Sequence, residues 1–237
     1  EAKIFFFLFV EDNSVAVATF ETVTQQLFIE SEVIIQHYNE SPLDFIVSDY
    51  AINYPFKYLA NDNFILSSYM VLPNEETRTL LNNWIYNVYK YNEKIQTYTL
   101  LQKLTTYIFK NFTYKVREEA GVQTAKQTLS YGSGSCRDFA FLFMEVVKCL
   151  GLATRFVSGY LYAPLMSDQV GSTHAWAEVY LPGGGWIGFD PTTGNIVGTD
   201  HISVAVSRLP DNVPPIAGSF LGVSDSTISV GVWVTKV

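Results

Sequence analysis

The chain has 237 residues, of which 48% are hydrophobic and 16% charged, and this composition predicts a globular protein with ample apolar material for a core. The formal net charge is −8, with no basic stripe of the kind that binds phosphates, so nucleic acid is excluded as an expected partner. No apolar run approaches the ~20 residues that a bilayer requires, so we expect no membrane span.

The first part of the chain, residues 1–73, predicts an antiparallel β module. Aromatic and β-branched runs alternate there with Asn, Asp, Ser and Pro. Strands are expected at Lys3–Val10, Val15–Phe20 and Gln26–Gln36, and a polar turn at Asn61–Asn63 precedes strand-like Phe64–Leu72. Glu11–Ser14 is typical of a hairpin turn. Because the sequence opens at Glu1 directly in strand-like residues and without an initiator Met, we expect the full-length protein to begin further upstream.

From Pro73 onward the spacing of apolar residues becomes helical. Helices are expected at Thr77–Tyr91, Leu100–Phe112, Val122–Leu129 and Cys136–Leu150. Gly151 follows the last of these, where a glycine commonly ends a helix. Strands are expected at Leu152–Tyr162, Thr173–Leu181, Trp186–Asp190, Ile202–Val206 and Thr227–Val237. The sequence therefore predicts an α+β domain over residues 74–237 behind the β module.

Cys136 is the first candidate for chemistry. It follows a Gly/Ser-rich turn and lies in the first turn of an apolar helix. The unpaired backbone N–H groups and the helix dipole there favour a thiolate, and the same N–H groups can donate to an oxyanion. Cys149 lies thirteen residues further along the same helix, about 20 Å away at ~1.5 Å per residue, so a disulfide is excluded. We expect Cys149 to be a packing thiol. Two cysteines in a chain of this size fit a reducing compartment, and we expect a cytoplasmic protein.

His174 and Asp190 are the candidate partners of this thiol. Side chains alternate between the two faces of a strand, so His174 shares a face with Trp176 and Glu178. The residues between them are small or apolar and form the opposite face. A glycine-rich turn follows, and a loop of two to four residues puts Asp190 opposite Trp176, Ala177 or Glu178. In the Trp176 register, Asp190 is a diagonal neighbour of His174 at roughly 7 Å, within reach of two side chains. A carboxylate there can orient the imidazole.

Three sequence blocks, in this order, carry a resemblance to a known family: Gly134–Ala140, His174–Val179 and Gly185–Thr192. They resemble the transglutaminase-like superfamily, and more closely its bacterial members that are regarded as cysteine proteases. The resemblance covers roughly residues 75–222. It implies a papain-like α+β core, with a nucleophile helix packed on an antiparallel sheet. It also implies that Cys136 is the nucleophile, His174 the general base and acid, and Asp190 the orienting residue.

Further candidates surround this triad. Trp176 either walls the substrate cleft or packs in the ordinary way. Tyr131 is a candidate for the second oxyanion donor, on its position in the sequence alone. Arg137 either contacts an acidic substrate, pairs with Asp138 or lies in solvent. Asp138 itself is expected to complement the helix dipole, and His201 to have a structural role.

The expected function is cysteine-dependent hydrolysis of a peptide or isopeptide amide bond, through a thioacyl-enzyme on a peptide or protein substrate. Two alternatives stay open: an amine acyltransferase of the transglutaminase type, and a non-catalytic binding or scaffold protein that retains the triad. No cofactor is expected, because the triad is chemically complete. No metal is expected either: Cys136, His174, Asp190 and His201 offer suitable atoms, but the usual short-spaced ligand pairs are absent.

Overall fold

The computed structural model describes residues 2–38, 43–91, 93–162, 173–222 and 227–235. The chain divides into two compact units, Glu1–Glu40 and Ser41–Val237. The first unit is built around a β hairpin, and the second contains every described helix and the main sheet. The domain boundary expected near residue 73 stays a prediction.

The first unit holds strands β1 (Ala2–Leu8) and β2 (Ser14–Phe20), which pair antiparallel with Ala2 opposite Phe20. The expected hairpin and its turn are thus confirmed. The strand expected at Gln26–Gln36 is wrong, because residues 21–38 contain no strand. Its consecutive apolar side chains at positions 27–29 are 55%, 75% and 60% exposed, so no alternate face is buried there.

The helical layer of the second unit precedes its sheet in the sequence. Its α-helices are α1 (Ala60–Leu66), α2 (Glu75–Ile85), α3 (Thr97–Asn111), α4 (Ala125–Tyr131) and α5 (Cys136–Cys149). Its 3₁₀ helices are η1 (Asp49–Ala51), η2 (Ser67–Tyr69) and, after the sheet, η3 (Pro210–Asn212). The four expected helices are present, although α2 ends earlier than its pattern predicted. Gly151 follows α5 at φ 75°, the left-handed conformation that ends helices.

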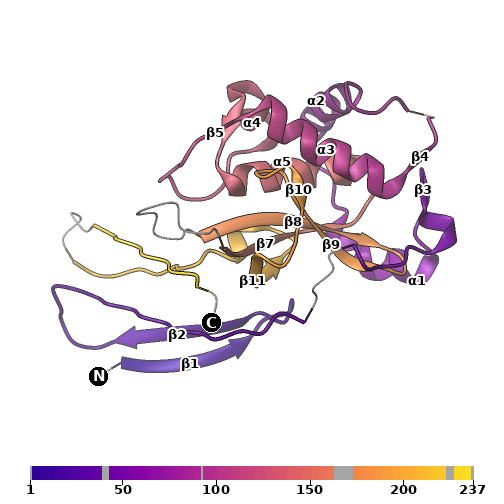
Figure 1. Ribbon diagram of the computed structural model, residues 1–237. Helices are drawn as coiled ribbons and strands as arrows, with labels where there is room; N and C mark the ends of the chain where they lie inside the picture. The colour runs from indigo at the N-terminus through magenta and orange to yellow at the C-terminus, as the bar shows by residue number, and fades with distance from the viewer. Residues whose placement is uncertain (1, 39–42, 92, 163–172, 223–226, 236–237) are drawn as a thin grey trace. The chain divides into compact units, whose positions relative to one another are not determined.

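A five-stranded sheet forms the other layer (Figure 1). Its strands, in spatial order, are β10 (Asn195–Ile196), β9 (Gly185–Asp190), β8 (Thr173–Leu181), β7 (Thr154–Leu161) and β11 (His201–Ser207). Every neighbouring pair is antiparallel. Three short pieces complete the pairing: β3 (Asn53–Tyr54) with β4 (Ile95–Gln96), and β5 (Thr113–Tyr114) with β6 (Ser133–Gly134), the last pair parallel.

Two further strand predictions are wrong. Phe64–Leu72 begins within α1 and continues into η2, because only Leu66 of that apolar run is buried while its neighbours Phe64 and Ile65 are 82% and 69% exposed. One helical turn can bury a single apolar residue, whereas a strand would bury every second one. In the tail expected to form a closing strand, the described residues 227–235 contain only an isolated bridge at Val232.

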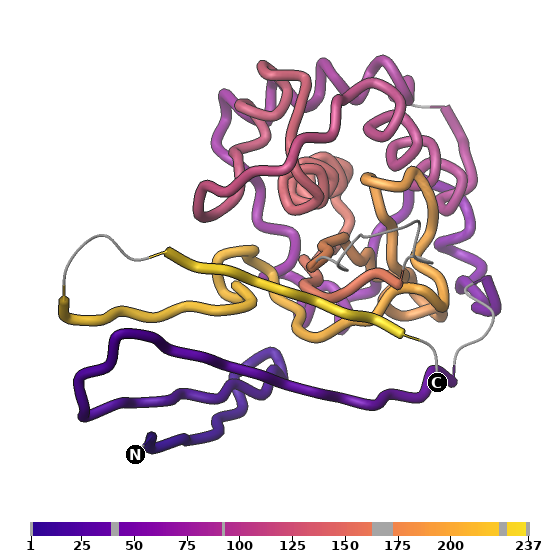
Figure 2. Tube along the Cα trace, turned by 60° about the vertical axis from the view of Figure 1, so that its left-hand side comes forward, coloured from indigo at the N-terminus to yellow at the C-terminus, as the bar shows by residue number. Residues whose placement is uncertain are grey.

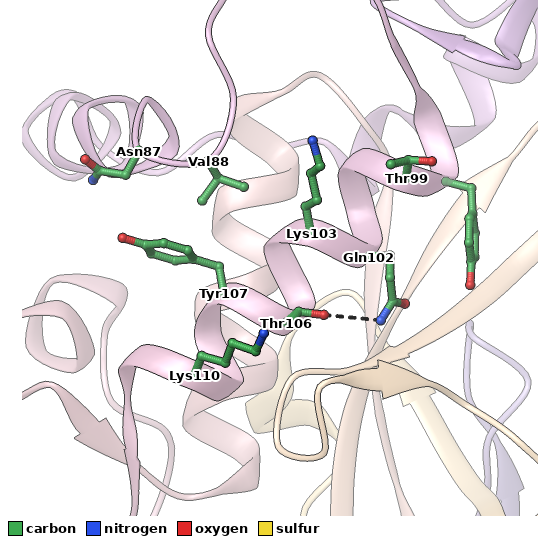
Figure 3. Close-up of a pocket in the computed structure, with 9 residues that line it drawn as sticks. Asn87, Val88, Thr99, Gln102, Lys103, Thr106, Tyr107 and Lys110 are labelled. Carbon is green, nitrogen blue, oxygen red and sulfur yellow. Dashed lines mark hydrogen bonds between the residues drawn. The ribbon is translucent and has the colours of Figure 1, made fainter.

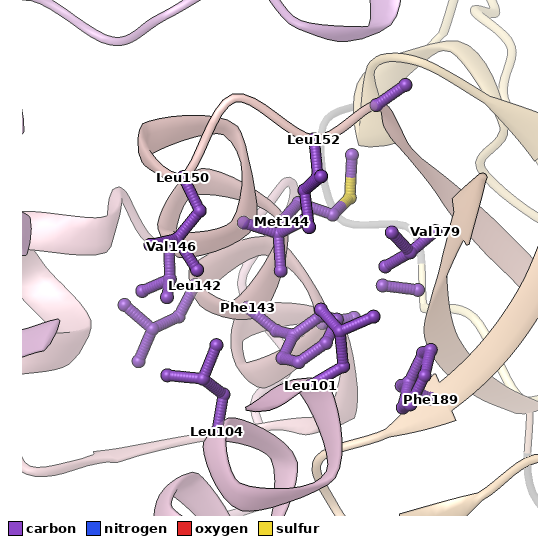
Figure 4. Packing of buried hydrophobic residues seen from close by; sticks show 14 of the residues in the cluster. Leu101, Leu104, Leu142, Phe143, Met144, Val146, Leu150, Leu152, Val179 and Phe189 are labelled. Atoms are coloured by element: carbon purple, nitrogen blue, oxygen red, sulfur yellow. The ribbon is translucent and has the colours of Figure 1, made fainter. Parts of the chain in front are cut away.

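Helix α5 is the centre of the second unit. It contacts β7 and β8 on one side and α2, α3 and α4 on the other, and Figure 2 looks almost along its axis. Its side chains Phe139, Leu142, Phe143, Met144, Val146 and Val147 are all at most 2% exposed. They pack against apolar residues of α3 and the sheet (Figure 4). The Phe143 ring stacks on that of Phe189 in β9, with centroids 5.7 Å apart. This packing sets the distance between the start of α5 and the sheet.

The α+β architecture expected from the sequence is confirmed: a buried helix packs on an antiparallel sheet, and an N-terminal β hairpin precedes them. Among the described residues, no helix combines the length and the apolar character needed to cross a bilayer.

Candidate active site

Helix α5 begins at Cys136 because the residues around it form a cap. Ser135 is the N-cap residue in an extended conformation. The carboxylate of Asp138 accepts hydrogen bonds from the backbone N–H and the hydroxyl of Ser135, both at 2.8 Å. Gly134 permits this approach, since a Cβ there would lie 2.8 Å from Cβ of Asp138. Cys136 is half-buried in the first helical turn, where backbone N–H groups lack partners within the helix.

Asp138 also anchors the helix start to the preceding loop. Its buried carboxylate accepts from Nη1 of Arg117 at 2.6 Å and from the backbone N–H of Gln123 at 2.7 Å. Burial alone would raise the pKa of Asp138, but the hydrogen bonds from Gln123, Ser135 and Arg117 outweigh it, and the pKa lies below its ordinary value. The expected negative charge near the helix N-terminus is therefore present, and it is part of a buried ion pair.

His174 and Asp190 meet across the β8–β9 hairpin. Leu181 pairs with Gly185 and Ala177 with Phe189, so a three-residue turn joins the strands and the register leads Asp190 toward Trp176. This is the register in which Asp190 was expected to be a diagonal neighbour of His174. Nε2 of His174 lies 2.8 Å from Oδ2 of Asp190, and both side chains are buried.

This contact changes the titration of both groups. Burial lowers the pKa of His174, but the hydrogen bond with Asp190, followed by one with Cys136, raises it to about 9. Burial raises the pKa of Asp190, yet the hydrogen bonds from His174 and His201 bring it well below its ordinary range. Both effects favour an imidazolium facing a carboxylate at neutral pH. Cys136 lies near enough to His174 to help raise the pKa of the imidazole.

His201 is a second imidazole on the same carboxylate. Its Nε2 lies 3.1 Å from Oδ2 of Asp190, and its side chain is only 8% exposed. A structural role was expected for His201, and sequence periodicity gave no sign of this contact. The reason is topological. β11 is an edge strand that pairs with β7, and β7 and β8 separate it from β9, which carries Asp190.

Trp176 is packed inside the protein. It is 1% exposed, and its ring meets that of His201 edge-on, with centroids 5.2 Å apart and an interplanar angle of 80°. Its centroid lies 6.2 Å from that of His174. Of the two roles expected for Trp176, this burial favours packing, here directly against the two histidines.

Known proteins share part of this sequence and this fold. Residues 88–191 match the sequence profile of the transglutaminase-like superfamily. The chain contains a transglutaminase-like domain. A structure from Cytophaga hutchinsonii, described as that of a candidate cysteine protease, superposes with a TM-score of 0.53 at 22% identity. The superposition covers 75% of this chain and 61% of that one, and it supports the shared fold.

Curated relatives of the transglutaminase-like domain come from mycobacteria. An uncharacterized protein of Mycobacterium leprae is 36% identical over 109 residues, which cover 44% of this chain and 38% of the relative. An uncharacterized protein of Mycobacterium tuberculosis is 32% identical over 138 residues, covering 54% of this chain and 44% of the relative. The chain thus spans less than half the length of these relatives.

Two tyrosines precede the start of α5 in the transglutaminase-like domain. Tyr131 ends α4 and is 62% exposed, and its hydroxyl makes no hydrogen bond among the described residues. Its role as an oxyanion donor stays a prediction. Tyr114, which the sequence did not single out, pairs with Gly134 through β5 and β6. Burial raises the pKa of Tyr114, and the nearby Cys136 and Asp190 raise it further, so Tyr114 lies beside the candidate site.

Arg137 forms no ion pair with Asp138 among the described residues and instead bonds to the preceding loop. Its Nη2 donates to the backbone carbonyl of Arg117 at 3.2 Å and to that of Glu119. These contacts help to hold residues 117–119 against the start of α5. Whether Arg137 also meets a substrate stays a prediction.

The His174, Asp190 and His201 side chains are also the atoms that a metal ion would use. One ligand atom from each lies within 4.8 Å of the others, and all three residues are buried. However, both Nε2 atoms approach the same carboxylate oxygen at 2.8 and 3.1 Å. A nitrogen that donates its hydrogen to that oxygen cannot also direct a lone pair at a metal. The hydrogen-bonded arrangement therefore accounts for this cluster.

A separate groove lies along α3 (Figure 3). It is lined by Asn87, Val88, Tyr98, Thr99, Gln102, Lys103, Thr106, Tyr107 and Lys110. None of the residues expected to act in chemistry belongs to its lining. Gln102 is turned toward the sheet side, where its Nε2 donates to Thr106 and to the carbonyl of Gly194 at 3.3 and 2.9 Å.

Proposed function

We propose that this chain is a cysteine-dependent hydrolase of amide bonds in peptides or proteins. Cys136 is the nucleophile, His174 the general base and acid, and Asp190 the residue that orients His174. The observation that carries the proposal is the use of the two nitrogens of His174. Nε2 is occupied by Asp190 at 2.8 Å, so Nδ1 is the atom left to exchange a proton with Cys136, which lies near enough to help raise the pKa of His174. A thiol, an imidazole and a carboxylate joined in this order can generate a nucleophile.

The charges of the site support this assignment. With a pKa of about 9, His174 favours the imidazolium form at neutral pH, and Asp190 remains a carboxylate. A thiolate at Cys136 would complete a row of alternating charges at the start of α5. The partial positive charge of the helix N-terminus favours the same thiolate. The fold shared with the Cytophaga hutchinsonii protein, which is described as a candidate cysteine protease, is consistent with this chemistry.

In the proposed first step, the Cys136 thiolate attacks the carbonyl carbon of an amide, and the electron pair of the C=O bond moves to oxygen. Unpaired N–H groups in the first turn of α5 donate to this oxyanion. When the carbonyl forms again, the C–N bond breaks and the imidazolium of His174 gives its proton to the leaving amine. A thioester on Cys136 and a neutral His174 remain.

In the second step, His174 removes a proton from water while the water oxygen attacks the thioester carbon. The C–S bond then breaks, which releases a carboxylic acid and restores the thiolate and the imidazolium. An amine that replaced water would give a new amide and make the enzyme an acyltransferase. Mass spectrometry of the products of a peptide library, with and without an added primary amine, distinguishes hydrolysis from transfer.

The proposal is tested first by alkylation of Cys136 with iodoacetamide as a function of pH. A Cys149→Ser background leaves a single thiol, and Cys149 is a suitable residue to remove because burial raises its pKa to about 11. We expect rapid labelling at pH 6, where an ordinary thiol with a pKa of about 8.5 is protonated, and we expect His174→Ala to abolish it. Labelling that follows an ordinary thiol in both proteins would contradict the proposal and favour a binding protein.

A further inference from the structure

His201 uses both of its ring nitrogens. The backbone N–H of Gly198 donates to Nδ1 at 3.2 Å, so that nitrogen presents its lone pair. In a neutral ring the hydrogen is then on Nε2, which lies 3.1 Å from Oδ2 of Asp190 and donates to it. His201 therefore reaches the carboxylate as a hydrogen-bond donor and needs no positive charge to do so.

The carboxylate of Asp190 is held by three donors from different parts of the chain. The backbone N–H of Thr192 donates to Oδ1 at 2.8 Å, while His174 and His201 share Oδ2. Asp190 is 0% exposed, so water has no access to replace a missing donor. Without His201 each oxygen would keep a single donor, and the plane of the carboxylate would be less restricted.

The surrounding sheet is shaped to bring His201 to this position. Gly159 of β7 lies opposite His174, and a Cβ there would come within 2.1 Å of the carbonyl oxygen of Ile202 and 2.8 Å of Cη2 of Trp176. The missing side chain lets β11 approach, and the β11–β7 register shifts between Ser203, which pairs with Gly159, and Ala205. Trp176 then packs edge-on against His201. These contacts restrict the ring to the orientation that meets Asp190.

We propose that His201 is a positioning residue. Its Nε2–H holds the Asp190 carboxylate in one orientation, and that carboxylate directs Nδ1 of His174 toward Cys136. The inference rests on the proposed function for the role of Cys136, whereas the link between His201 and Asp190 can be measured by itself. His201 thus becomes a fourth side chain of the site, beside the three that the sequence predicted. The site requires its Nε2–H donor and not its aromatic ring.

The test uses two variants in the Cys149→Ser background. His201→Phe keeps a ring of similar size but removes the donor. His201→Gln keeps a side-chain N–H that can reach Asp190 and an oxygen that can accept from Gly198. The ¹³C carboxyl signal of Asp190, assigned with Asp190→Asn, is followed against pH together with the rate of Cys136 alkylation.

We expect His201→Phe to move the Asp190 titration upward by about one pH unit, because the anion loses a donor, and to slow alkylation at pH 6 about tenfold. In His201→Gln, the rate of Cys136 alkylation should remain within about twofold of the parent, and the Asp190 titration should shift little. Parent-like behaviour of a folded His201→Phe, or equal defects in both variants, would overturn the inference. If the parent itself labels as an ordinary thiol, the proposed function fails, while the Asp190 titration still decides the role of His201.

Discussion

Replacing Asp190 by asparagine tests the electrostatics of the proposed triad most directly. The carboxamide keeps the size of the side chain and removes its negative charge. The pKa of His174 is about 9, against an ordinary value of 6.5. This difference corresponds to about 300-fold in the protonation equilibrium, or about 3 kcal/mol. Asp190 supplies the largest of the contributions that raise this pKa, and Cys136 supplies the next.

In Asp190→Asn, only Cys136 would oppose the effect of burial on His174. We therefore expect the pKa of His174 to fall below about 7. Alkylation of Cys136 at pH 6 should slow by about 10- to 100-fold, since most of the 300-fold factor depends on the carboxylate. The chain has three histidines, so ring-proton NMR follows each titration separately.

The matched control is Asp211→Asn, which removes one negative charge from an exposed position. It should leave both the His174 titration and the alkylation rate unchanged. If His174 still titrates near 9 in folded Asp190→Asn, and labelling at pH 6 is unaffected, the carboxylate does not support the imidazolium. The reasoning from the 2.8 Å contact would then be wrong.

Three further predictions concern stability. Arg117→Ala should lower the free energy of unfolding by about 2–3 kcal/mol in urea titrations, because it leaves the fully buried Asp138 without its ion-pair partner; a loss below 0.5 kcal/mol would show that the remaining hydrogen bonds suffice. Gly159→Ala should cost about 1–3 kcal/mol, since the new Cβ meets the backbone oxygen of Ile202, and an unchanged melting temperature would contradict this. The raised pKa of His174 implies a contribution to stability that is complete below about pH 6.5 and is lost as pH rises to about 9. Urea titrations across that range should show a falling free energy of unfolding in the parent, and His174→Ala should lack this fall.

The candidate site was predicted best where local rules decide the geometry. The glycine-rich turn after β8 limited the hairpin to a few registers, and in one of them Asp190 lies diagonally from His174. The helix start at Cys136 followed from the Gly/Ser-rich turn before it and from the apolar period after it, and α5 does begin at Cys136. In each case the relevant contacts lie within about twenty residues, so spacing along the chain carries the information.

Features that depend on distant contacts were missed. His201 reaches Asp190 because Gly159 lets β11 approach β7, and no local pattern indicates that pairing. Gln26–Gln36 has the apolar and β-branched residues of a strand, but a strand also needs a partner for its backbone groups. Within the described residues of the first unit, only β1 and β2 form such a pair. Composition predicts the tendency to form a strand, and tertiary contacts determine whether it forms.

The two halves of the candidate site come from different layers of the second unit. Cys136 is placed by the cap of α5 and by the Arg117–Asp138 ion pair, whereas His174 and Asp190 are placed by the sheet. The link between the layers is apolar, for example the stacked rings of Phe143 and Phe189 at 5.7 Å. A proton transfer between sulfur and nitrogen is sensitive to small displacements, and a closely packed core limits them. The buried apolar face of α5 therefore contributes to the proposed chemistry as well as to stability, because it sets the distance between Cys136 and His174.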